Sequence, residues 1–186
     1  YVGCKCVVSD IVIGAAAVMA DMNGYSKASH IKSKINEMIH LTETLYACSI
    51  ACSAEGVQLP SGQYFVNMLL ANVSKHNGTR YIYEIDRLAQ DIAGGFIATM
   101  PSQAELESPE IGKYVDKYFK GVDGVSTADR MRVARLIEVM TGGTALVESM
   151  HGAGSPQAQE VMYSKLANLD AKKKAALAIA GVKTTD

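Results

Sequence analysis

Cysteine is scarce in this sequence, which has four among its 186 residues, at positions 4, 6, 48 and 52. That number is too small for a fold held together by disulfides, and nothing in the sequence indicates secretion. The pairs Cys4-x-Cys6 and Cys48-x-x-x-Cys52 also lack the spacing of a zinc ribbon. We therefore expect reduced thiols and a cytoplasmic protein.

An excess of charge is also missing, since the formal net charge is −1. A broad electrostatic surface for nucleic acid is therefore not expected. The longest apolar stretches are interrupted by Asp21, Glu37 or Arg87, so no membrane span is predicted. The chain begins at Tyr1 with neither an initiator Met nor a signal peptide, which suggests a piece of a longer polypeptide.

Alternating Val, Ile and Thr runs with hairpin turns are absent as well, and apolar residues recur instead every three or four positions. Residues 76–78, His-Asn-Gly, either bend one long helix or divide it in two. The predicted fold is an all-α bundle of long, roughly antiparallel helices. We expect helices over residues 9–22, from 26 or 29 to 56, 63–97, 109–120, from 126 or 127 through 140, 156–168 and 170–181.

One loop between predicted helices has an unusual composition, ESMHGAGSPQAQ at residues 148–159. Ser155 is a good helix N-cap and Pro156 suits the first helical position. The two glycines before them allow a ligand to approach the main chain closely. Such a helix start can bind a phosphate or pyrophosphate, with a hydrogen bond from His151, and Glu148 is then better placed as an acid or base. The alternative is a tight connection with no ligand.

Three further segments are as unusual as ESMHGAGSPQAQ: HLTETLYACSIACSAEG (40–56), LLANVSKHNGTR (69–80) and RLAQDIAGG (87–95). Together these four motifs resemble the C-terminal part of the 4-hydroxybutyryl-CoA dehydratase family, whose members also act as vinylacetyl-CoA Δ-isomerases. The similarity runs from YVGCK at the start to AIAGVK near the end. The wider group includes flavin-dependent 4-hydroxyphenylacetate 3-monooxygenases, with a fold similar to the acyl-CoA dehydrogenases.

The resemblance implies a three-part subunit, of which residues 1–8 would be a connecting segment and residues 9–186 the C-terminal helix bundle. It implies a homotetramer that acts on an acyl-CoA with FAD and a [4Fe–4S] cluster held by three cysteines and one histidine. Cys4 matches one of these cysteines, and the other three ligands would lie outside this sequence. The remaining cysteines are assigned to packing.

The resemblance also implies roles for single residues. Glu148 matches a glutamate implicated in catalysis, and Tyr1 and Lys5 match neighbours of the active site. The segment expected to lie against the flavin consists of His151, Gly152, Ala153, Gly154 and Ser155. Residues 142–147 look shorter than the family's run into this segment.

The implied chemistry is a radical dehydration, in which the flavin oxidises the deprotonated substrate by one electron and the cluster iron acts as a Lewis acid on the leaving hydroxyl. The 186 residues alone are expected to have no turnover. Two alternatives stay open: a flavin-dependent aromatic hydroxylase of the same fold, and a non-catalytic helical module for oligomerisation.

Overall fold

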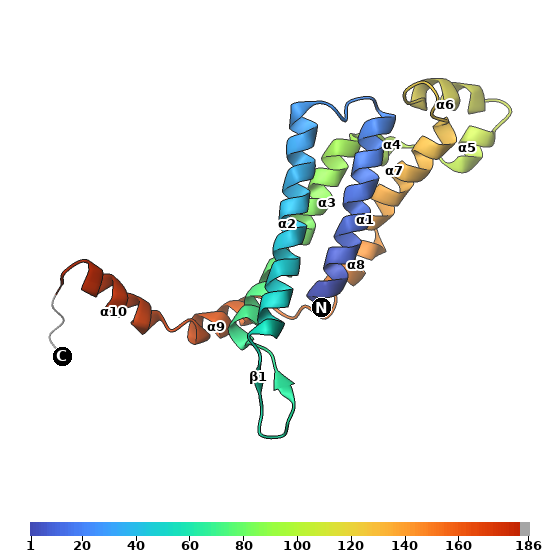
Figure 1. Ribbon diagram of the computed structural model, residues 1–186. Helices are drawn as coiled ribbons and strands as arrows, with labels where there is room; N and C mark the ends of the chain where they lie inside the picture. The colour runs from blue at the N-terminus through green and yellow to red at the C-terminus, as the bar shows by residue number, and fades with distance from the viewer. Residues whose placement is uncertain (183–186) are drawn as a thin grey trace.

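The computed structural model describes residues 1–182 and is built almost entirely of helices (Figure 1). This confirms the predicted all-α class. The elements in chain order are α1 (Val2–Met22), α2 (Ser29–Ala54), β1 (Val57–Gln58), β2 (Tyr64–Phe65), α3 (Met68–Ala93), α4 (Phe96–Thr99), α5 (Gln103–Glu107), α6 (Gly112–Phe119), α7 (Thr127–Gly142), α8 (Thr144–Met150), α9 (Pro156–Leu166) and α10 (Leu169–Ile179).

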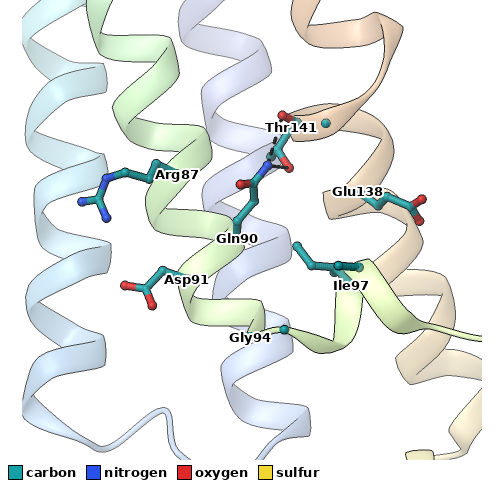
Figure 2. Close-up of a pocket in the computed structure, with 10 residues that line it drawn as sticks. Arg87, Gln90, Asp91, Gly94, Ile97, Glu138 and Thr141 are labelled. Carbon is teal, nitrogen blue, oxygen red and sulfur yellow. Dashed lines mark hydrogen bonds between the residues drawn. The ribbon is translucent and has the colours of Figure 1, made fainter.

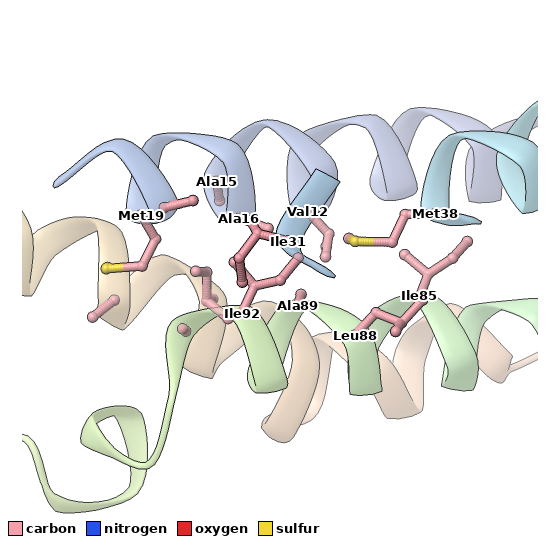
Figure 3. Packing of buried hydrophobic residues seen from close by; sticks show 14 of the residues in the cluster. Val12, Ala15, Ala16, Met19, Ile31, Met38, Ile85, Leu88, Ala89 and Ile92 are labelled. Carbon is pink, nitrogen blue, oxygen red and sulfur yellow. The ribbon is translucent and has the colours of Figure 1, made fainter. Parts of the chain in front are cut away.

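The core lies between four helices, because α1 and α3 pack against each other and each also packs against α2 and α7. Figure 3 shows Met19 of α1, Met38 of α2 and Ile85 of α3 within this core, and none of the three side chains reaches solvent. Burying such a side chain contributes roughly 1.5–3 kcal/mol to stability. The four helices therefore form the rigid part of the molecule on which the other elements are placed.

Helix α1 begins at Val2 and not at residue 9, so residues 2–8 form its first two turns. Val2 and Cys6 pack against Leu45 of α2, and this contact explains the longer helix. Lys5 interrupts the apolar pattern of the sequence, yet it is only 3% exposed. A lysine is normally read as an exposed residue, so the sequence pattern did not predict that the buried helix includes this position.

Helix α1 also differs from expectation in its membrane propensity. By length and composition it is sufficient to cross a membrane, with a mean hydropathy of 1.9 over its most apolar part. Asp21 does not interrupt it, because this residue lies in its last turn. In the structure, Val12, Ala16 and Met19 pack in the core of the bundle, as they do in the central helix of many soluble proteins.

Two further differences concern glycine. Helix α3 runs without a break through residues 76–78, and a side chain at Gly78 would approach Tyr1 Cε1 to 3.4 Å. The Tyr1 ring therefore lies directly against α3 at Gly78. The turn predicted at Leu59-Pro60-Ser61-Gly62 is present, but it joins the antiparallel strands β1 and β2. Two-residue strands are too short to show the alternation that identifies a strand in a sequence.

A chain of hydrogen bonds ties the helices together at the end of the bundle away from Tyr1. Arg130 Nε of α7 donates to Asn23 Oδ1 at 2.7 Å, and Asn23 Nδ2 donates to Tyr25 Oη at 2.6 Å. Tyr25 in turn donates to the carbonyl oxygen of Ile92, near the end of α3. Burial lowers the pKa of the Arg130 guanidinium, which also donates to the Phe119 carbonyl oxygen.

Replacing Tyr25 by phenylalanine is expected to lower the free energy of unfolding by about 1–2 kcal/mol, because the Ile92 carbonyl and the Asn23 amide each lose a partner. Urea unfolding followed by circular dichroism measures this change. Tyr118→Phe is the matched control, since Tyr118 is 71% exposed. Equal loss of stability in both variants would contradict this role for Tyr25.

The C-terminal elements leave the bundle. Helix α9 packs on α3, whereas α10 extends away from the four-helix core (Figure 1). No residue of α10 is buried. The three lysines at residues 172–174 lie on this exposed helix.

Candidate functional site

Three of the predicted site residues lie at the start of α1: its N-cap Tyr1, and Cys4 and Lys5 in its first turn. The exposed Cys4 thiol donates to the Tyr1 carbonyl oxygen at 2.9 Å. The Lys5 ammonium lies 4.6 Å from the centre of the Tyr1 ring, so the aromatic face partly offsets the cost of burying this charge. The structure thus brings Tyr1, Cys4 and Lys5 together in one helical turn.

The Tyr1 ring is held between two lysines. Lys75 of α3 lies 5.8 Å from the ring centre, on the neighbouring helix to Lys5. The phenol oxygen is buried and has no hydrogen-bond partner among residues 1–182. Burial, and then the neighbouring Cys4 and Tyr83, raise the pKa of this phenol. A small hollow of about 260 Å³ next to Tyr1 is lined by Lys75 and by the polar side chains of Ser49, Cys52 and Ser74.

The other cysteines behave as packing residues. Burial raises the pKa of the Cys6 thiol, and Cys48 and Cys52 are half-buried. Asn72, on the apolar side of α3, donates to the Met68 carbonyl oxygen of its own helix at 2.8 Å and so has a partner without any ligand.

The glycine segment forms a tight turn before α9. Gly152 and Gly154 have φ angles of +79° and +73°, a region of backbone conformation that glycine adopts without strain. Between them Ala153 is buried. Pro156 takes the first helical position as predicted, but the Ser155 side chain does not cap the helix. The N–H groups in the first turn of α9 are therefore left without a capping side chain.

Glu148 and His151 flank this turn at the end of α8. Both side chains are exposed, and the His151 amide donates to the Glu148 carbonyl oxygen at 3.1 Å. The carboxylate and the imidazole are thus available to a ligand that sits on the glycine turn. Glu148 is separated from Gly152 by Ser149, Met150 and His151.

Helix α9 is fastened to α3 through His76. The His76 ring meets the Tyr163 ring edge-on, with 5.7 Å between ring centres, and its Nε2 lies 3.8 Å from a Glu160 carboxylate oxygen. His76 is two residues from Gly78, which Tyr1 contacts. The N-terminal thiol turn and the helix that follows the glycine turn therefore contact the same stretch of α3 along its length.

Sequence reasoning did not select His76, Lys75 or Gln159 as site residues. Gln159 is 4% exposed, and its Nε2 donates to the Ala153 carbonyl oxygen at 2.7 Å. Lys75 and His76 belong to the segment KHNG at residues 75–78. The glycine inside a predicted helix was the one feature of the sequence that could have drawn attention to them. No such feature marks Gln159, because its contact with the Ala153 carbonyl oxygen exists only once the turn has formed.

A larger cleft of about 650 Å³ lies at the carboxyl ends of α3 and α7 (Figure 2). Gln90 donates to the backbone and side-chain oxygens of Thr141 across it. Two of its charged residues are paired within the protein, Asp91 with Lys34 at 2.6 Å and Arg87 with Glu84. None of the site residues predicted from the sequence lines this cleft.

The described residues fit a flavin better than a cluster. The glycine turn offers close main-chain approach and free N–H groups, and three buried polar atoms around it and Tyr1 lack partners: Tyr1 Oη, His76 Nδ1 and Gln159 Oε1. By contrast, no three His, Cys, Asp or Glu side chains within residues 1–182 gather as metal ligands. A single thiol does not hold a [4Fe–4S] cluster.

The family model for the 4-hydroxyphenylacetate 3-hydroxylase C-terminal region matches residues 1–181. The chain belongs to this family. Within the 4-hydroxyphenylacetate 3-hydroxylase C-terminal family, it is 52% identical to the 4-hydroxybutyryl-CoA dehydratase/vinylacetyl-CoA-Delta-isomerase of Clostridium aminobutyricum, over 98% of this chain and 40% of that protein. The resemblance found in the sequence motifs is thereby confirmed.

Solved structures agree with this assignment to the 4-hydroxyphenylacetate 3-hydroxylase C-terminal family. An oxygen-tolerant archaeal 4-hydroxybutyryl-CoA dehydratase from N. maritimus is 49% identical, with a TM-score of 0.92 over 98% of this chain and 37% of that one. The oxygenase component of 4-hydroxyphenylacetate 3-monooxygenase, solved with FAD, is 20% identical and has a TM-score of 0.84 over 96% of this chain and 38% of that one. The second likeness shows a shared fold.

The chain spans about two fifths of the length of these relatives in the 4-hydroxyphenylacetate 3-hydroxylase C-terminal family. Its alignment with the Clostridium relative is 195 positions long and so exceeds the 186 residues of this chain. The relative therefore has residues that this chain lacks.

Proposed function

We propose that this chain is the C-terminal helical domain of a 4-hydroxybutyryl-CoA dehydratase that also isomerises vinylacetyl-CoA. The observation that carries the proposal is the 52% identity to the Clostridium enzyme, which extends over 98% of the chain and so over both candidate ligand-binding segments. The monooxygenases among the relatives are only 20–24% identical, so the hydroxylase alternative has weaker support.

In the proposed enzyme FAD, when bound, supplies the one-electron oxidation of the acyl-CoA substrate. The glycine turn and the N–H groups of α9 bind and orient the flavin, with His151 and Ser155 beside it. Glu148 moves a proton at the substrate because its carboxylate is exposed at the edge of this turn. Tyr1 and Lys5 line the side nearest Cys4, where two lysines give a positive environment for the carbonyl oxygen of a thioester.

The proposal extends to parts outside this chain. Cys4 is its single contribution to a [4Fe–4S] cluster whose other ligands belong to the rest of the polypeptide. Because this chain holds one thiol of the four ligands needed, the isolated 186 residues have no turnover. We further propose a cytoplasmic homotetramer with no nucleic-acid or membrane partner.

The full-length protein is expected to dehydrate 4-hydroxybutyryl-CoA to crotonyl-CoA and to contain both FAD and about equal amounts of iron and acid-labile sulfide. Product formation followed by mass spectrometry, with flavin and iron analysis, tests this directly. FAD without iron or sulfide, combined with hydroxylation of a phenolic substrate, would instead support the aromatic hydroxylase.

The non-catalytic module is tested by replacing Gly152 and Gly154 with valine in the same full-length protein. Both positions have positive φ, so valine strains the turn and moves the main chain. We expect the variant to retain less than about one tenth of its FAD. Gly124→Val is the control, because this glycine also has a positive φ but lies between α6 and α7. Unchanged FAD in the double variant favours a module for oligomerisation alone.

A further inference from the structure

The hairpin formed by β1 and β2 carries no charge. No Asp, Glu, Lys, Arg or His occurs between Glu55 and Lys75, a stretch that contains the whole hairpin and the start of α3. Its large apolar side chains nevertheless face solvent: Val57, Leu59, Tyr64, Phe65 and Val66. Soluble proteins usually place charged residues on exposed strands, because bare strand edges pair with other chains. The hairpin therefore has the composition of an element that another surface covers.

Both faces of the hairpin are exposed. Val57 lies opposite Phe65 in the ladder, and Gln58 lies opposite Tyr64. Because neighbouring residues of a strand point to opposite faces, Phe65 belongs to one face of the ribbon and Tyr64, which is 75% exposed, to the other. Figure 1 shows the hairpin projecting from the end of the bundle. A two-stranded hairpin alone is at best marginally stable in water, so we expect a packing partner.

The hairpin leaves the bundle next to the Tyr1 turn. At its base the Asn67 amide donates to the Cys52 carbonyl oxygen at 2.9 Å. The hollow beside Tyr1 is lined by Gly3 and by residues that precede and follow the hairpin in the sequence, Cys52, Ser53 and Ala71. The exposed Cys4 thiol is the neighbour of Gly3 in the same turn. The thiol and the apolar hairpin therefore lie at one end of the bundle.

The position of Cys4 indicates what covers this end. In the proposed enzyme its thiol is one of four cluster ligands, and the other three belong to polypeptide outside these 186 residues. That polypeptide must reach the end of the bundle where Cys4 and the hairpin lie. It is also large enough to cover the hairpin, since this chain spans only 40% of the Clostridium relative. A second copy of the chain, by contrast, is not required to approach Cys4.

We propose that the β1–β2 hairpin is a docking surface for the N-terminal part of the same polypeptide, which packs on Tyr64 and Phe65 while it brings the remaining cluster ligands to Cys4. The inference rests on the proposed function, because it requires a longer polypeptide that shares a cluster with this domain. It gives the hairpin a positioning role. Apolar contacts on its two faces hold the other ligands at a fixed place relative to the thiol.

The test places a photo-crosslinking side chain in the hairpin of the full-length protein. Tyr64 is replaced by p-benzoylphenylalanine, which keeps an aromatic ring, and the irradiated protein is analysed on denaturing gels and by peptide mass spectrometry. Tyr118 is the matched control position, because it is 71% exposed on α6, at the opposite end of the bundle. We expect at least about fivefold more crosslinked product from position 64, since only a packed side chain has another surface within reach. The products should join position 64 to peptides outside residues 1–186 of the same polypeptide.

A double variant, Tyr64→Ser with Phe65→Ser, measures the consequence for the cluster. Both side chains lie outside the core, so the helical content is expected to stay unchanged. Bound iron should pass to a chelator at least about fivefold faster, because weaker docking exposes the cluster to solvent. Crosslinks that join two copies, or crosslinking no stronger than at position 118, overturn this inference and leave the proposed function standing. An unaltered full-length protein without iron or sulfide overturns both.

Discussion

Replacing Glu148 by glutamine in the full-length protein is expected to lower kcat for dehydration by about 10²–10⁴-fold, the usual contribution of a general acid or base. Glutamine has nearly the same shape but does not take up or release the proton. The carboxylate is exposed at the end of α8, so the substitution leaves the core contacts of the bundle unchanged. The FAD content is expected to stay within about 20% of the original, because the Glu148 side chain is about one helical turn away from the glycines.

Steady-state formation of crotonyl-CoA measures this effect, and Glu110→Gln provides the control, because Glu110 is exposed and lies far along the chain from the glycine turn. A variant with unchanged kcat would remove Glu148 from the chemistry. A variant that has lost both kcat and FAD would instead assign the carboxylate to the structure of the turn.

Replacing Asp86 by asparagine is expected to stabilise the protein above neutral pH. Asp86 is 5% exposed on α3, beside the core residues Ile82, Ile85 and Ala89, and burial raises the pKa of its carboxyl group to about 7. An unfolded aspartate has a pKa near 3.9, so between about pH 4 and pH 7 the folded protein holds a proton that the unfolded chain has lost. Stability therefore falls as the pH rises through this interval.

Asparagine has no proton to lose and removes this slope. The variant should exceed the original protein by on the order of 3 kcal/mol at pH 8 and differ little from it at pH 4.5. Urea unfolding at both pH values gives the comparison. Asp123→Asn serves as the control, because the Asp123 side chain is fully exposed. If the original protein loses no more stability than Asp86→Asn between pH 4.5 and pH 8, the carboxyl group is charged in the folded state throughout.

The regular helices could be predicted from local sequence. The stripe of α2 and the stop near Gly56 gave a helix close to the observed Ser29–Ala54. The start of α7 was expected at Ser126 or Thr127, and Ser126 is the cap, because its side chain accepts from the Asp129 amide. In these cases the information lies within a few residues, in the period of the apolar positions and in the capping residue.

The sequence failed where a distant contact decides the local structure. Helix α1 extends to Val2, where Val2 and Cys6 pack against Leu45 of α2, and the Tyr1 ring lies against helix α3 at Gly78. Both contacts join residues that are far apart in the sequence. Local propensity contains no trace of such a contact.

The candidate site divides in the same way. The turn at Gly152 and Gly154 and the start of α9 at Pro156 followed from residue type. Gln159 and His76 did not, because their importance comes from the folding of α9 back onto the turn and onto α3. Their partners lie six residues away for Gln159 and far along the chain for His76.

The polar ties of the bundle have a consequence for how such a domain changes between species. The hydrogen bonds from Arg130 through Asn23 and Tyr25 to Ile92 lock the bundle at the end away from Tyr1. The segment from Gly143 to Ser155 takes no part in them. A change of length within residues 143–155 therefore leaves these hydrogen bonds intact, so related domains can differ in this segment while the bundle keeps its packing.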